Sequence, residues 1–251
     1  MRLVITILLI YCIRAEGQTS LYIVGAVHKS SKNFNSDSIT SILTRLKPDL
    51  ILLELDSSFF DKDFKFKFKP RSNENVGTKE YISKHPTLIR PYDIKGRHLG
   101  ANVTALEIES LDRLRSIEWE LDSTQNKTYR ELLSTNNELI SFLKKNPYKI
   151  NQKYVYDLVE RNQILMYKGL LGIIESRKEM EDITIGFKQC GIYWDWRNKK
   201  MVENTLFFLN LDNFKNKTIV LFTGFLHKYY FLNELLAKQE QYRFLIKEYY
   251  Q

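Results

Sequence analysis

Three continuous apolar runs, separated by amphipathic stretches, predict the strands of a central sheet. They are residues 20–24, 49–56 and 217–223. A run that is apolar throughout buries both faces, as strands of parallel sheets do. Between the first two runs, residues 37–46 place Ile39, Ile42 and Leu43 on one helical stripe. Strand, helix, strand in this order is a parallel crossover unit, which predicts an α/β fold with a central mixed, mainly parallel sheet and flanking helices.

The remaining pattern extends this unit. Residues 88–97 and 242–247 read as two further strands, and residues 195–211 and 229–237 read as helices. Residues 104–177 are dense in Glu, Lys, Leu and Tyr and predict three helices, the last of them long. At 251 residues one domain is the expectation, so residues 18–251 are read as a single α/β domain with a helical insertion at about 103–182.

The first 17 residues have the pattern of a secretory signal peptide. Arg2 gives a positive start, residues 3–13 are apolar, and Ala15 and Gly17 are the small residues before the expected mature start at Gln18. The apolar run is shorter than the roughly 20 residues that span a bilayer. We therefore expect a secreted or periplasmic protein with no transmembrane segment after cleavage; the alternative is that this run forms a buried first strand.

Charge and cysteine content narrow the function classes. The formal net charge is +8, but the 38 basic residues are interleaved with 30 acidic ones, so no nucleic-acid partner is expected. Beyond the leader the one cysteine is Cys190, which excludes an internal disulfide in the mature chain. Cys190 is either a buried small hydrophobe, the reading we favour, or a nucleophile.

Residues 64–69 alternate strictly between phenylalanine and lysine. An extended segment with this pattern places three aromatic rings on one face and three cations on the other. We favour an edge strand whose lysines prevent edge-to-edge pairing. The alternative is a basic, aromatic rim that meets an anionic or lipid surface.

Two Gly-x-x-His turns follow two of the predicted strands, one near each end of the chain. They are residues 25–28 and 224–227, and they end in His28 and His227. A glycine at the carboxyl end of a strand allows a tight turn, and open α/β sheets bind ligands at that edge. Glu54 ends a third apolar run. These three side chains should line one pocket, either as ligands of a divalent metal ion or as a metal-free acid and base set.

The same residues carry a resemblance to a family. Gly25-Ala26-Val27-His28, Glu54, Arg197-Asn198-x-x-Met201 and Gly224-Phe225-Leu226-His227 resemble, in that order, the TraB, PrgY and Tiki superfamily, which includes erythromycin-esterase-like and ChaN-like proteins. The resemblance covers nearly the whole mature chain. It implies an α/β fold with a helical insertion and an active site at the sheet edge. Tiki members resemble metal-dependent proteases, esterase-like members hydrolyse with histidine and glutamate without an obligatory metal, and ChaN-like members bind haem.

Transferred residue by residue, the resemblance implies a catalytic set and a surrounding ligand-binding set. The catalytic set is His28, Glu54, His227 and Arg197, of which His28, Glu54 and His227 are also the candidate metal ligands. The candidate ligand-binding residues are Asp93, Arg97 and Asn198. The expected function is an exported hydrolase of a peptide or small-molecule ester, with haem binding without turnover as the alternative.

Two positions depart from the family pattern. Trp196 stands where the family places a glutamate, with Asp195 one residue earlier. Asp93 and Arg97 are separated where the family has an adjacent pair. Either departure is expected to change the chemistry of the site or to abolish it.

Overall fold

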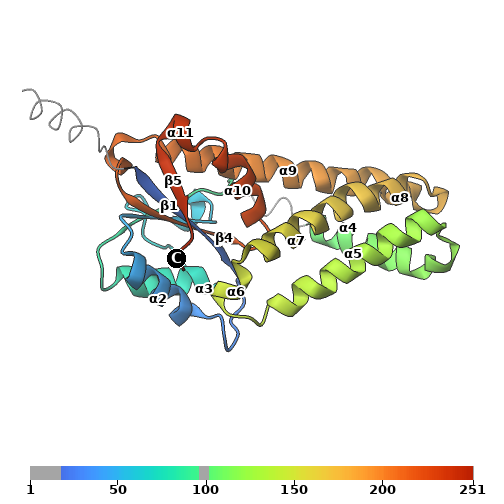
Figure 1. The fold of residues 1–251 in the computed structure, drawn as a ribbon, viewed down its shortest axis with the longest axis horizontal. Helices are drawn as coiled ribbons and strands as arrows, with labels where there is room; N and C mark the ends of the chain where they lie inside the picture. The colour runs from blue at the N-terminus through green and yellow to red at the C-terminus, as the bar shows by residue number, and fades with distance from the viewer. Residues whose placement is uncertain (1–17, 96–101, 251) are drawn as a thin grey trace, which may run out of the picture.

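The core of the protein is a parallel sheet with helices on both faces (Figure 1). A computed structural model describes residues 18–95 and 102–250. The strands are β1 (Thr19–Ala26), β2 (Leu50–Leu53), β3 (Leu88–Pro91), β4 (Thr218–Gly224) and β5 (Phe244–Lys247). Within the described residues they pair in the order β3-β2-β4-β1-β5, and every pairing is parallel. The predicted α/β class is confirmed, and the expected mixed sheet is parallel throughout this part of the chain.

Seven longer α-helices, three short α-helices and several single turns complete the described part of the chain. The longer ones are α2 (Ser36–Leu46), α3 (Asn73–Ile82), α4 (Asn102–Ser116), α5 (Ser123–Phe142), α7 (Lys153–Ile164), α9 (Glu181–Leu209) and α10 (Lys228–Leu236). The short ones are α6 (Pro147–Ile150), α8 (Leu171–Glu175) and α11 (Gln239–Tyr242), and a π-helical stretch (Leu165–Leu170) joins α7 to α8. Single 3-10 turns lie at Ser57–Phe59, Glu118–Glu120, Lys178–Met180 and Asp212–Phe214.

The two faces of the sheet bury separate apolar clusters. On one face Leu21, Leu52 and Leu221 pack against Met201 of α9 and Phe231 of α10. On the other face Val24, Ile51 and Phe222 pack against the helices α2 and α3. Because helices cover both faces of the sheet, the side chains on both faces of the central strands are apolar. The strands were therefore recognisable in the sequence as continuous apolar runs.

Helix α2 shows how local sequence sets the element boundaries. The side chain of Asn35 accepts a hydrogen bond from the backbone of Ser38, which forms a capping box at the start of the helix. Lys47 ends the helix in the left-handed conformation with φ 48°. Pro48 follows and cannot continue a helix, so the chain turns into β2.

The helical insertion has its own core. Helices α4, α5 and α8 extend away from the sheet (Figure 1), and they bury Leu114, Leu132 and Ile174 against the first half of α9. Ile183 and Phe187 of α9 belong to this core, whereas the second half of α9 covers the sheet. The helices and turns from α4 to the turn at Lys178–Met180 lie between Asn102 and Met180.

The predicted edge strand at residues 64–69 is wrong. This segment is an irregular loop whose bridge, between Phe60 and Phe66, is isolated. Phe64 has a φ of 58°, and Oδ1 of Asp61 accepts hydrogen bonds from the backbone amides of Asp63 and Lys65. This turn folds the chain back on itself, so the alternating pattern does not make an extended strand.

No helix among the described residues is long and apolar enough to cross a membrane. The predicted signal peptide at residues 1–17 lies outside the described residues.

Candidate functional site

The sheet order brings the three predicted site residues to one edge. Strand β4 lies between β1 and β2, with Ala26 opposite Gly224 and Leu53 opposite Phe222. Because the strands are parallel, their carboxyl ends meet at the same edge. The residues just beyond them are His28, Glu54 and His227.

Gly224 lies at the centre of this group. A β-carbon added to Gly224 would lie 3.3 Å from Nε2 of His28, 3.4 Å from Cδ2 of His227 and 3.5 Å from Oε2 of Glu54. The three side chains therefore surround one point. The absence of a side chain at Gly224 leaves the space in which they approach one another.

The first histidine is paired with a carboxylate that the sequence analysis did not identify. Nδ1 of His28 lies 2.6 Å from Oε1 of Glu74 in α3. The side chain of His28 is 45% exposed, whereas that of Glu74 is 5% exposed. Asn73 holds the turn in place, because its amide donates to the carbonyls of Val27 and Lys29. Because a carboxylate accepts a hydrogen bond at Nδ1, the ring proton of the neutral imidazole lies on Nδ1. Nε2 then carries the lone pair and can act as a base.

The second histidine is buried and bonded on both ring nitrogens. Nδ1 of His227 lies 2.6 Å from Oδ1 of Asn198, and Nε2 lies 3.1 Å from Nη1 of Arg197. Because guanidinium nitrogens only donate, Nε2 accepts and the proton lies on Nδ1. The indole of Trp194 stacks on the ring, with centroids 4.3 Å apart. These contacts hold His227 as a neutral imidazole in one orientation.

A buried ion cluster lies beside His227. The guanidinium of Arg197 donates to Oε1 of Glu54 at 2.6 Å and to both carboxylate oxygens of Asp93, at 2.7 Å and 3.1 Å. Burial alone lowers the pKa of Arg197, but hydrogen bonds and charge from Asp93 and Glu54 outweigh it and raise that pKa. Arg197 therefore shares its positive charge between two buried carboxylates, and it orients Glu54 rather than offering a free charge to a ligand.

This cluster does not fit the divalent metal that the resemblance implies. Oε1 of Glu54 and Nε2 of His227 both face the Arg197 guanidinium, so a cation already lies among the expected metal ligands. The other oxygen of Glu54 accepts hydrogen bonds from the amide of Gly224 at 2.6 Å and the hydroxyl of Thr223 at 3.0 Å. Within residues 18–95 and 102–250, no three His, Cys, Asp or Glu side chains are arranged to hold a metal ion.

A cleft of about 630 Å³ opens onto His28, Glu54 and Glu74. Another part of its lining is the loop that follows β2, which carries three phenylalanines and two basic residues. The remaining lining comes from the start of α3. The residues of the loop wall are Phe59, Phe66, Phe68, Lys69, Pro70 and Arg71, and those of α3 and its N-cap are Ser72, Glu74 and Asn75.

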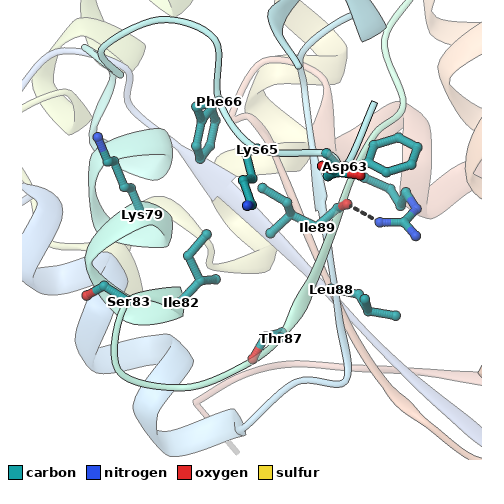
Figure 2. Close-up of a pocket in the computed structure, with 11 residues that line it drawn as sticks. Asp63, Lys65, Phe66, Lys79, Ile82, Ser83, Thr87, Leu88 and Ile89 are labelled. Carbon is teal, nitrogen blue, oxygen red and sulfur yellow. Dashed lines mark hydrogen bonds between the residues drawn. The ribbon is translucent and has the colours of Figure 1, made fainter. Parts of the chain in front are cut away.

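The same loop also bounds a smaller hollow of about 370 Å³ on its other side. Figure 2 shows Lys65 and Phe66 of the loop over the space between α3, marked by Ile82, and β3, marked by Ile89. The guanidinium of Arg90 lies 3.8 Å from the ring centroid of Phe64. This cation–π contact holds the loop against the sheet edge.

The candidate ligand-binding residues fall in different places. Asp93 belongs to the buried Arg197 cluster, and Asn198 is fully buried behind His227, where it also donates to the Trp194 carbonyl. Both therefore position other side chains and do not line the cleft. Arg97 lies outside the described residues. Trp196, the departure from the family pattern, is 46% exposed, and its ring contacts that of Tyr193 with centroids 5.9 Å apart.

Cys190 is buried in α9, and its thiol donates to the carbonyl of Gly186. Burial, with the nearby charge of Glu107, raises the pKa of the thiol to about 11. A thiol with this pKa is protonated near neutral pH, which agrees with the reading of Cys190 as a small buried residue.

No family model, no curated protein and no solved structure matches this chain.

Proposed function

We propose that this chain is a hydrolase of ester or peptide bonds that uses His28 as a general base without a metal ion. The observation that carries the proposal is the 2.6 Å contact between Nδ1 of His28 and Glu74, in a cleft large enough for a small substrate. The resemblance of the two Gly-x-x-His turns to esterase-like proteins supports the same chemistry.

The mechanism follows from the tautomer of His28. With Nδ1–H directed at Glu74, Nε2 accepts a proton from a water molecule as that water attacks the substrate carbonyl carbon. The Glu74 carboxylate stabilises the imidazolium that forms, as a buried carboxylate does for a catalytic histidine. When the tetrahedral intermediate breaks down, Nε2 returns the proton to the leaving oxygen or nitrogen.

Glu54 and His227 have supporting roles in this proposal. Glu54 lines the cleft, and its position is fixed by Arg197, Thr223 and the amide of Gly224. It keeps one carboxylate oxygen beside the reacting histidine, where it orients water or the substrate. His227 accepts a hydrogen bond from Arg197 and so holds the guanidinium in register with Glu54.

The test is hydrolysis by the purified chain of nitrophenyl esters of short acids and of fluorogenic peptides. The variant His28→Asn keeps a donor near Glu74 but has no base, so the rate should fall by about 10²–10⁴-fold. His85→Asn is the matched control, because His85 is exposed, stacks on Tyr81 and lies outside the cleft. Wild-type rates should persist after dialysis against a chelator.

Equal rates in the His28 and His85 variants, or no hydrolysis of any ester or peptide, would contradict the proposal. Activity that a chelator removes and zinc restores would favour the metal-dependent form that the resemblance also implies.

Binding of haem without turnover is the second candidate. One observation favours it: a partly exposed histidine lies in a cleft whose other wall carries three phenylalanine rings. Titration with haem would give a Soret band that the His28→Asn variant loses if this candidate is correct.

We also propose that the protein is exported. The support is the charged and apolar pattern of residues 1–17, and mass spectrometry of the exported protein should find Gln18 as the first residue.

A further inference from the structure

The loop wall of the cleft, which carries Phe59, Phe66 and Phe68, exposes aromatic surface. Phe59 and Phe68 are 40% and 63% exposed, and their rings meet edge to face with centroids 6.1 Å apart. The third ring, Phe66, rests on the buried Phe60 with centroids 5.1 Å apart. A ligand that covers these rings removes their apolar surface from water, which stabilises the bound state.

The rim of the same wall is basic. Lys69 and Arg71 are exposed and line the cleft, and neither takes part in an ion pair with any residue that the structure describes. The carboxylates of the cleft, Glu54 and Glu74, are buried instead, and they contact Arg197 and His28 respectively. The exposed charge on this wall of the cleft is therefore positive.

The start of α3 adds polar groups that have no partner in the protein. Ser72 is the N-cap of this ten-residue helix but makes no capping hydrogen bond. Its hydroxyl, Oδ1 of Asn75 and Oε2 of Glu74 are buried atoms with no hydrogen-bond partner among the described residues. Asn75 is 8% exposed and lines the cleft. Buried polar groups without partners indicate a ligand: the Ser72 hydroxyl can donate to an anion, whereas Oδ1 of Asn75 and Oε2 of Glu74 only accept and need a hydrogen-bond donor. The positive end of the α3 dipole favours an anionic group nearby.

We propose that the cleft binds an anionic substrate with an apolar group about the size of a phenyl ring. The apolar group covers Phe59 and Phe68, and a carboxylate or similar anion lies between Lys69, Arg71 and the N-terminus of α3. In the hydrolase, which this inference takes from the proposed function, the bond to be cleaved then lies beside His28. The substrate class is an ester or amide that carries, besides the bond to be cleaved, a separate acid group and an apolar group.

Binding of soluble probes tests this directly. Phenylbutyrate, phenylbutanol and phenylbutylamine share one apolar group and differ in charge, and titration calorimetry with the purified chain compares them. Phenylbutyrate should bind at least about ten-fold more tightly than the alcohol, and the amine should bind most weakly. Phe68→Ser and Lys69→Glu should each weaken phenylbutyrate binding by about ten-fold.

Two control variants match these changes outside the cleft. Phe207 is 61% exposed and contacts Phe208 edge to face, so Phe207→Ser removes the same kind of ring from α9. Lys127 is exposed in α5, so Lys127→Glu makes the same charge reversal in the insertion. Both controls should keep wild-type affinity.

The proposal is overturned if phenylbutanol binds as tightly as phenylbutyrate, or if Phe68→Ser and Lys69→Glu leave the affinity unchanged. Binding only to vesicles of phosphatidylglycerol, and not to the soluble probes, overturns it in favour of a membrane surface. The His28→Asn variant should still bind phenylbutyrate, so loss of hydrolysis and loss of binding report separately on the proposed function and on this inference.

Discussion

The two Gly-x-x-His turns have the same sequence pattern but different surroundings. His28 is half exposed, faces a cleft and contacts a carboxylate, whereas His227 is buried and held between an amide, a guanidinium and an indole. The turn places both rings around Gly224, and the helices that pack on each turn decide what each ring can do. A repeated motif therefore defines a location, while burial and partners define the chemistry.

The largest expected effect is a loss of stability when the buried ion cluster beside His227 is disrupted. Arg197→Ala removes the guanidinium that donates to the buried carboxylates of Glu54 and Asp93, so the free energy of unfolding should fall by about 3–5 kcal/mol. Arg113→Ala is the control, because Arg113 pairs with Glu109 and Asp182 at the surface and should cost at most about 1 kcal/mol. Urea denaturation followed by circular dichroism measures both. Equal losses would mean that the Arg197 cluster is not structural.

The two histidines should separate in the same assay. His227→Asn removes the acceptor of Arg197 and the stacking on Trp194, so unfolding should be easier by about 1–3 kcal/mol. His28→Asn retains a donor for Glu74 at a partly exposed position and should change stability by about 0.5 kcal/mol or less. If His28→Asn lowered the free energy of unfolding more than His227→Asn does, His28 and not His227 would be the structural histidine.

The glycines of the two turns give a finer test. A β-carbon at Gly25 would lie 3.1 Å from Oδ1 of the buried Asn151 and 3.2 Å from Cα of Phe225, so Gly25→Ala should destabilise by about 1–3 kcal/mol. At Gly224 the neighbours are side-chain atoms at 3.3 Å or more. Gly224→Ala should therefore lower hydrolysis about ten-fold while costing at most about 1 kcal/mol of stability. Ester assays and urea denaturation of both variants separate the two effects.

The smallest effect concerns Cys190. A pKa of about 11 leaves about 100-fold less thiolate near pH 8 than the ordinary value of 9.0 would, so iodoacetamide should modify the folded chain about 100-fold more slowly than the unfolded chain. Because the pKa is raised, the rate should increase as the pH rises towards that value. Cys190→Ala should keep the rate of hydrolysis. Rapid alkylation near pH 8 with loss of hydrolysis would instead support the alternative that Cys190 is a nucleophile.

The sequence predicted the sheet well because β1, β2 and β4 are buried on both faces and read as apolar runs. The same runs predicted that His28, Glu54 and His227 would lie together. Glu74 was missed because α3 buries polar residues, among them Asn73, Asn75 and Thr78, and so has no apolar stripe. Its signal was weak: an acidic residue in a first helical turn after a serine N-cap.

Two other features could not be read from local pattern. The segment 64–69 alternates as a strand does, but the left-handed Phe64 and the turn at Asp61 depend on contacts with β3 and on hydrogen bonds within the loop. The position of Asn198 behind His227 depends on where α9 crosses the sheet edge. Tertiary packing decides both outcomes and overrides propensity.

Helix α9 has 29 residues, about 44 Å of continuous helix, and it contributes to both the core of the insertion and the core of the sheet. Arg197 lies between those two contributions. If either core lost its packing, the half of α9 that it covers would be exposed and the helix would be destabilised along its length. The chain should therefore melt in one cooperative transition and not as two units. A cavity made deep in the insertion should therefore also lower the melting temperature of the sheet edge that carries His28 and His227.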